Sequence, residues 1–214
     1  MEDYLKAVHQ IAEAEGGGPV STQALADRLA ISTASVTGMI KRLHALDLVE
    51  HSPYHGVRLT VRGEAVALEV LRHHRLLELY LVEQLGMPWE DVHAEADRLE
   101  HHISEGLEDA IAAKLGQPAV DPHGDPIPRR DGTVLRVDAV PLATLAAGDT
   151  ATVSRVPDRD PRLLQYLAER GLVPGAALAV TTLDDLAGVI SIRACGREHT
   201  LALHTAATIL VAPT

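Results

Sequence analysis

Four side chains that could bind a divalent cation share one face of a single predicted helix. They are His93, Asp97, Glu100 and His101, within residues 92–102 (VHAEADRLEHH). Because an α-helix has about 3.6 residues per turn, spacings of four, seven and eight residues place these side chains in one stripe. Imidazole and carboxylate groups together suit Mn, Fe, Co or Zn. The stripe is therefore a candidate metal site.

The same segment has a simpler interpretation, because acidic runs on helices are often solvated surface. Residues 90–109 contain eight acidic side chains and one basic side chain, Arg98. Apolar residues from Val92 to Leu107 recur at helical spacing and form a neighbouring stripe. The candidate ligands thus lie at the edge of a buried face, where another helix can add ligands. The pattern alone leaves both interpretations open.

Composition excludes several classes of protein. The chain has 214 residues, of which 46% are hydrophobic, enough for two or three small domains. No apolar run approaches the ~18 residues of a membrane span, and Glu2, Asp3 and Lys6 argue against a signal peptide. A single cysteine, Cys195, excludes an internal disulfide and a thiolate-rich zinc site. We expect a cytoplasmic protein with no membrane partner.

A linker is expected at residues 116–132 (GQPAVDPHGDPIPRRDG), where four prolines and three glycines disfavour helix. The residues before it show helical periodicity. After it, the pattern predicts strands at 134–140, 151–156, 173–183 and 189–193, and a short helix at 161–172. The predicted fold class is mainly α with a small β-rich unit at the C-terminus.

The N-terminal residues predict a winged helix-turn-helix. Ser21 is expected to cap the second helix, and Pro53 and Gly56 to lie in a turn between two strands. The expected elements are helices at 3–14, 22–30 and 33–46 and a strand–turn–strand unit at 48–60. This order is typical of the winged variant of the helix-turn-helix.

Candidate DNA contacts gather at the start of the third helix and in the wing. Small hydroxyl donors suit phosphates and base edges, and a helix N-terminus favours phosphate. The candidates are Ser32, Thr33, Ser35, Thr37, Lys41, Arg42 and Arg58. The net charge of −11 is unusual for a DNA-binding protein, although residues 1–65 hold six basic against eight acidic residues. A protein-docking module is the alternative.

Over nearly its full length, the chain resembles the diphtheria-toxin-repressor family of metal-dependent transcriptional regulators, particularly its manganese-responsive branch. The resemblance rests on the opening Glu2-Asp3-Tyr4, the winged helix, and residues 72–78 (RHHRLLE), 92–101 (VHAEADRLEH) and 121–128 (DPHGDPIP). It implies a winged helix-turn-helix DNA-binding domain at 1–63, a helical metal-binding and dimerisation domain at 64–120, a linker at 121–133 and a FeoA-like, SH3-like β-barrel at 134–214.

The resemblance implies a primary metal site. Its ligands would be Asp3, Asp97, Glu100 and His101, joined by His74 in manganese regulators. Iron-sensing relatives carry a sulfur-bearing residue at the first two of these positions, and this chain has carboxylates there. Hard oxygen donors combined with imidazoles suit Mn(II), with Fe(II) as the alternative.

The resemblance also implies an ancillary site that includes Glu78. In manganese-type relatives, linker and barrel residues join it, which here are Asp121, His123 and Asp160. In iron-type relatives, the site instead uses His74, Glu78 and His93, and this chain has both sets. Lys6 occupies a position where a binuclear subgroup carries glutamate. Two separated metal sites per chain are therefore expected.

We thus expect a metal-dependent transcriptional repressor, not an enzyme, that controls metal-homeostasis genes. The apolar runs 66–71 and 76–82 suggest a homodimer, which would present two winged helices to a palindromic double-stranded operator. The alternatives are a metallohydrolase, a winged-helix regulator that senses an organic ligand, and a structural adaptor with a metal cross-link. The absence of an HExxH motif argues against the hydrolase.

Overall fold

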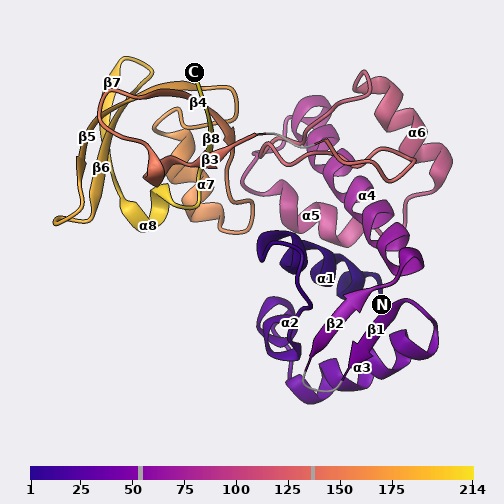
Figure 1. The fold of residues 1–214 in the computed structure, drawn as a ribbon. Helices are drawn as coiled ribbons and strands as arrows, with labels where there is room; N and C mark the ends of the chain where they lie inside the picture. Colours follow the sequence, from indigo (N-terminus) through magenta and orange to yellow (C-terminus); the bar gives the residue numbers. More distant parts are fainter. Residues whose placement is uncertain (53–54, 136–137) are drawn as a thin grey trace. The chain divides into compact units, whose positions relative to one another are not determined.

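The computed structural model describes residues 1–52, 55–135 and 138–214. The chain forms two compact units, each described here by itself. The first contains Met1–His73 and Pro128–Thr133, and the second contains His74–Ile127 and Val134–Thr214. The long helix α4 (Val61–Leu85) contributes to both, so the domain boundary expected after residue 63 falls inside a continuous helix (Figure 1).

The N-terminal unit is a winged helix-turn-helix, as expected. Its elements are α1 (Glu2–Ala14), α2 (Thr22–Leu29), α3 (Thr33–Ala45), β1 (Val49–Ser52) and β2 (Gly56–Leu59). The hydroxyl of Ser21 accepts a hydrogen bond from Ala24 N at 3.0 Å and so caps α2. Leu5, Leu25 and Ile40 are fully buried between the helices. Pro53, expected in the turn of the wing, lies outside the described residues.

The helical part of the second unit consists of the C-terminal half of α4, α5 (Val92–Leu99) and α6 (Glu105–Lys114). Leu76, Ala96 and Ile111 are buried in its core. Helix α5 ends at Leu99, inside the run of residues 92–102 for which a helix was predicted. The next residue, Glu100, is the C-cap, which keeps helical dihedral angles and donates its N–H to Ala96 O at 2.9 Å.

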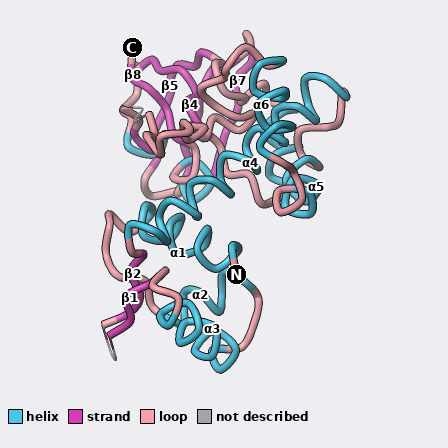
Figure 2. Tube along the Cα trace, turned by 90° about the vertical axis from the view of Figure 1, so that its right-hand side faces the viewer, coloured by secondary structure: helices cyan, strands magenta, loops and turns pink. Residues whose placement is uncertain are grey.

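The C-terminal part of the second unit is an antiparallel sheet with the order β3-β8-β4-β5-β6-β7. The strands are β3 (Val140–Pro141), β4 (Thr150–Arg155), β5 (Ala177–Asp184), β6 (Val189–Ala194), β7 (Arg197–Ala202) and β8 (Leu210–Pro213). Among the described residues β3 and β7 are edge strands, so the expected barrel is an open sheet, whose strands are drawn in magenta near the C-terminus in Figure 2. The short helices are η1 (Leu142–Thr144), α7 (Pro161–Ala168) and α8 (Leu203–Ala206).

The expected strands of this sheet were right in part. Strands β4 and β6 agree with the prediction within two residues, and β5 begins at Ala177 because residues 173–176 form a turn. The predicted strand 134–140 was wrong in its described part, where only residue 140 is extended in the sheet; residues 136–137 lie outside the described range. Strands β7 and β8 were not predicted. No helix in the described ranges is long and apolar enough to cross a membrane.

Candidate metal centre and nucleic-acid interface

The imidazole of His74 on α4 lies between two groups of potential metal ligands in the second unit. Its Nδ1 atom is 2.6 Å from Glu100 Oε2 and 3.3 Å from Asp97 Oδ1. Its Nε2 atom is 3.0 Å from Glu78 Oε1 and 3.1 Å from His93 Nδ1. Glu100 follows the buried Ala96 by one helical turn, so its side chain lies on the inner face of α5 toward α4 and is buried. One histidine therefore joins ligand candidates from α4, from α5 and from the end of α5.

The first group consists of His74, Asp97 and Glu100, with His101 beside it. His101 Nε2 lies 3.5 Å from Glu100 Oε1. The Asp97 side chain is 48% exposed, so this group opens to solvent on the α5 side. Asp3 belongs to the N-terminal unit, where it lies exposed in the first turn of α1. The structure thus brings together the expected ligands of the second unit.

The second group is formed by His74, Glu78 and His93, and it continues to the linker residues Asp121 and His123. His93 Nδ1 lies 2.9 Å from Glu78 Oε1. Both sets of ancillary ligands that the sequence suggested therefore meet at Glu78, except for Asp160: His74 and His93 lie at one carboxylate oxygen and His123 at the other. This explains why the sequence could not separate them.

The strongest sign of a cation site is a pair of buried atoms without hydrogen-bond partners among the described residues, Glu78 Oε2 and His123 Nδ1. They face each other at 3.8 Å, in side chains that are 0% exposed. The Nε2 atom of His123 lies 3.0 Å from the carbonyl oxygen of Trp89, so Nε2 donates there, and Nδ1 is the atom whose lone pair would bind a cation once its proton is displaced. A cation bound about 2.0–2.2 Å from each donor fits between them. The residues present thus fit a divalent metal.

The electrostatics of this group agree with a cation site. Burial alone would raise the pKa of Glu78, but the imidazoles of His74, His123 and His93 hold the pKa well below its usual value. Burial lowers the pKa of His123, and the Glu78 and Asp121 carboxylates outweigh it and raise that pKa to about 9. Burial raises the pKa of Asp121, and the neighbouring carboxylates of Asp125 and Glu78 raise it further. A positive charge at this place would relieve the crowding of carboxylates.

Two of the expected ligands have other tasks in the structure. The Oδ1 atom of Asp121 accepts hydrogen bonds from the backbone N–H groups of His123 and Asp125, at 2.8 and 2.9 Å. Asp160 is the N-cap of α7 and accepts from Arg162 N at 3.0 Å. The carboxylate of the C-terminal part that reaches the described cluster is that of Asp158, whose Oδ2 lies 3.5 Å from His93 Nδ1.

Sequence reasoning missed Asp158, although a signal was present. Asp160 precedes Pro161, and an aspartate followed by proline is a typical start of a helix. That pattern assigns Asp160 to the cap and leaves Asp158, two residues earlier, for another role. Trp89 and Asp125 were also missed, because the contacts of Trp89 with His123 and of Asp125 with Arg75 and Arg155 form only in the folded chain.

The candidate DNA contacts lie on the exposed surface of the N-terminal unit. Six are in α3 or cap it, and Arg58 lies on β2 in the wing. Ser32 caps α3 by accepting from Ser35 N at 3.2 Å, and Thr37 Oγ1 donates to Thr33 O at 2.8 Å. These contacts leave the hydroxyl groups exposed along the first turns of the helix.

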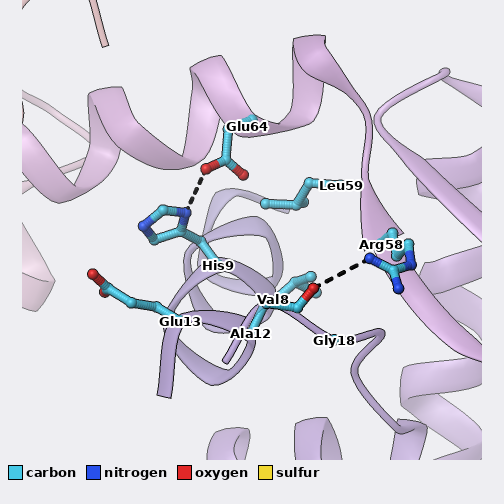
Figure 3. A pocket seen from close by; sticks show the side chains of 9 residues that line it. Val8, His9, Ala12, Glu13, Gly18, Arg58, Leu59 and Glu64 are labelled. Atoms are coloured by element: carbon cyan, nitrogen blue, oxygen red, sulfur yellow. Dashed lines mark hydrogen bonds and ion pairs between the residues drawn. The ribbon is translucent and has the colours of Figure 1, made fainter. Parts of the chain in front are cut away.

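A cavity of about 320 Å³, not foreseen from the sequence, also lies in the N-terminal unit. Residues of α1, the glycine loop, β2 and the start of α4 line it (Figure 3). His9 Nδ1 of α1 lies 2.7 Å from Glu64 Oε1 of α4, and Arg58 donates to Gly17 O at 3.2 Å. The same arginine that could contact DNA is thus held against the loop after α1.

A winged helix-turn-helix joined to buried histidine and carboxylate ligands defines a metal-dependent DNA-binding regulator. Family comparisons give the same class. Residues 1–57 match the N-terminal DNA-binding domain of iron-dependent repressors, residues 60–129 match their metal-binding and dimerisation domain, and residues 140–213 match the FeoA domain. The chain belongs to the iron-dependent repressor family.

Individual relatives cover the whole chain. The iron-dependent repressor IdeR of Mycobacterium leprae is 33% identical over 95% of this chain and 92% of its own length. A solved structure of a manganese-dependent transcriptional repressor in complex with manganese has a TM-score of 0.91 and 39% identity, over 100% of this chain and 99% of that one. The repressor ScaR with bound Zn²⁺ has a TM-score of 0.83 and 30% identity, over 100% of this chain and 99% of that one.

The family consists of transcriptional repressors, so this chain is a metal-responsive regulator of transcription and not an enzyme. The metallohydrolase and the sensor of an organic ligand, both left open by the sequence, are not supported by these relatives.

Proposed function

We propose that this chain is a Mn(II)-responsive repressor of metal-homeostasis genes that binds a palindromic operator as a homodimer. The observation that carries the proposal is the donor set in the second unit, which consists of carboxylates and imidazoles without sulfur. Such donors suit Mn(II) or Fe(II). The similarity to manganese-dependent repressors supports Mn(II), and the iron-dependent repressor IdeR keeps Fe(II) as the second candidate.

The proposed primary site consists of His74, Asp97, Glu100 and His101, completed by Asp3 from the N-terminal unit. Asp3 is included because of the family resemblance and its place in the first turn of α1. The proposed ancillary site uses Glu78 and His123, with His93, Asp121 and a carboxylate from residues 158–160 as the further candidates. These side chains hold the ion, and the ion supplies positive charge that offsets their repulsion.

Regulation follows if Asp3 and the second unit bind the same ion. An ion bound by Asp3 of α1 and by ligands of α4 and α5 would then restrain the DNA-binding helices. A metal that binds the tied state better shifts the population toward it, in proportion to that preference. In the proposed division into domains, with boundaries at residues 63, 120 and 133, the first segment binds DNA and the second binds the primary metal. The linker and the C-terminal segment contribute ligands to the ancillary metal site.

The test starts from a randomised duplex library, because it requires no known operator. Duplexes selected by the full chain with Mn(II) should show an inverted repeat, and a chelator should release them. Fluorescence anisotropy should then rank Mn(II), anaerobic Fe(II) and Zn(II) as activators at one ionic strength, since salt alone changes affinity strongly. Binding that persists unchanged after chelation would exclude the metal switch, and Fe(II) activation at lower concentration than Mn(II) would reassign the effector.

A further inference from the structure

The linker turn that carries His123 is held by arginines from two distant elements. On one side, Arg75 of α4 donates from Nη1 to Pro126 O at 2.6 Å and from Nη2 to Asp125 Oδ1 at 3.0 Å. On the other side, Nη2 of Arg155, the last residue of β4, lies 2.8 Å from the same Asp125 oxygen. Asp125 is therefore the shared acceptor of two guanidinium groups.

The backbone brings the turn equally close to β4. Val156 N donates to His123 O at 2.9 Å. At Gly124, whose φ is +92°, a Cβ atom would lie 2.0 Å from Ser154 O. The turn therefore packs against the end of β4 without space for a side chain, and its position depends on that strand.

The charges in this contact are largely removed from water. The side chains of Asp125 and Arg75 are buried, whereas that of Arg155 is 42% exposed. Removing Arg155 would leave the Asp125 charge compensated by Arg75 alone and would break the side-chain contact with β4, which favours rearrangement of the segment that carries Asp125. In this protein the rearranging segment would be the turn with His123.

We propose that Asp125 and Arg155 are positioning residues of the second metal centre. They hold the linker turn between α4 and β4, and so keep His123 Nδ1 opposite Glu78 Oε2. The inference rests on the proposed function, since it requires that this pair binds a cation. A displacement of about 1 Å is enough to weaken a metal site, so small movements of the turn matter. Neither residue contacts the ion itself.

The arrangement has a consequence for the C-terminal sheet. Because β4 fixes the linker turn and the turn carries His123, metal binding at Glu78 and His123 favours the state in which the turn is packed against the end of β4. By linkage, docking favours metal binding to the same degree. The second metal thus stabilises the contact between the linker turn and β4.

The test measures Mn(II) binding by the full chain without DNA. In Arg155→Ala, the affinity for the second Mn(II) should fall about 10- to 100-fold, the range found for outer-shell partners of metal ligands, while the first remains unchanged. Isothermal titration gives both affinities. Trp89, the one tryptophan of the chain, gives a local signal, because its ring stacks on His123 at 5.4 Å.

Two variants act as controls. Arg155 contacts Asp125 through one nitrogen, so Arg155→Lys should restore most of the second affinity. Arg197→Ala removes an exposed arginine from β7 and should change neither affinity. Hydrogen exchange of residues 121–127 in metal-free protein should be faster in Arg155→Ala than in either control.

The outcomes separate this inference from the proposed function. If the parent binds a single Mn(II) per chain, the second centre does not exist. The positioning role then fails, and the ancillary site of the proposed function fails with it. If the parent binds two and Arg155→Ala binds them with the same affinities, the positioning role is wrong while the proposed function stands. A fall in both affinities that Arg155→Lys does not restore would indicate general destabilisation, which also overturns the inference.

Discussion

The single ring of His74 limits how the two metal groups can be occupied. A neutral imidazole has one lone pair, and its other nitrogen carries a proton. Nδ1 faces Glu100 and Nε2 faces Glu78, so His74 can bind an ion in one group while it donates to a carboxylate of the other. The two ligand sets that include His74 therefore share it, and loss of this side chain should affect both groups.

Replacement of Glu100 tests the primary group. Glu100→Gln keeps the size of the buried side chain but removes the charge that a metal ion requires. The Mn(II) affinity of this group should fall by more than about 100-fold, beyond the effect of losing an outer-shell partner. Mn(II)-dependent binding to the selected operator should disappear, as measured by anisotropy.

Glu95→Gln is the matched control for this prediction. It lies on the same helix, where its carboxylate is 3.2 Å from Arg98 in an exposed pair, and such pairs contribute little. It should behave as the parent. If Glu100→Gln retained the parent's metal dependence, the primary site would lie elsewhere.

Replacement of Asp160 distinguishes a helix cap from a metal ligand. Asparagine caps helices about as well as aspartate, so Asp160→Asn should leave stability unchanged, whereas Asp160→Ala should cost about 1 kcal/mol. We expect the second Mn(II) affinity to be unchanged in Asp160→Asn and lower in Asp158→Asn. Isothermal titration would show the reverse if Asp160 is a ligand, as the family resemblance implies.

At this scale the sequence identified the types of the ligands but not all of their neighbours. The stripe from His93 to His101 follows from helical spacing, which is a local property. Trp89, Asp125 and Asp158 come from other segments, and their contacts with the metal group depend on how the linker turn meets β4. Spacing in one segment contains no information on such contacts.

At the scale of elements, prediction succeeded where a signal was local. The capped helices of the N-terminal unit were found because caps and apolar spacing agree. The end of α5 was misplaced because the ligand stripe continued the helical spacing beyond Leu99. Strand β8 was missed because it is short, with four residues, and is stabilised by pairing with β4 and β3.

The cap of α3 allows DNA binding and stability to be separated. Ser32 accepts a hydrogen bond from Ser35 N and lies exposed at the helix N-terminus. Ser32→Ala should reduce the free energy of unfolding by about 1 kcal/mol, whereas Ser32→Asp should preserve it, because aspartate is an equally good cap. The added charge of Ser32→Asp should repel phosphate and weaken operator binding at least tenfold.

Thermal unfolding and anisotropy, measured on the same samples, check this prediction. Metal affinity should be unchanged in both variants, since Ser32 lies in the N-terminal unit. If Ser32→Asp bound the operator as tightly as the parent, the start of α3 would not face phosphate, and the docking-module alternative for this unit would regain support.

At the scale of the whole molecule, net charge and dimerisation both bear on DNA binding. The net charge of −11 opposes DNA binding, and two divalent cations per chain would offset part of it. The apolar run of α4 is weaker support for a dimer than its sequence suggested, because Leu71 and Leu76 are already fully buried within one chain. Apolar surface remains exposed in the helical part of the second unit at Leu85, Leu99 and Leu107.

Replacement of Leu107 tests the dimer and the palindrome together. Its side chain on α6 is 51% exposed in the single chain and lies in the segment that matches the dimerisation domain, so Leu107→Glu should leave folding intact and place charge in the interface. Sedimentation should then show a monomer. Affinity for the full operator should fall to that of the parent for a half-site, because two linked reading heads bind far more tightly than one.

Leu186→Glu is the control, since Leu186 is 100% exposed in the turn between β5 and β6 and lies outside that segment. A dimeric Leu107→Glu would exclude this surface, and a monomer that still bound the full operator as the parent does would exclude recognition of a palindrome by two subunits.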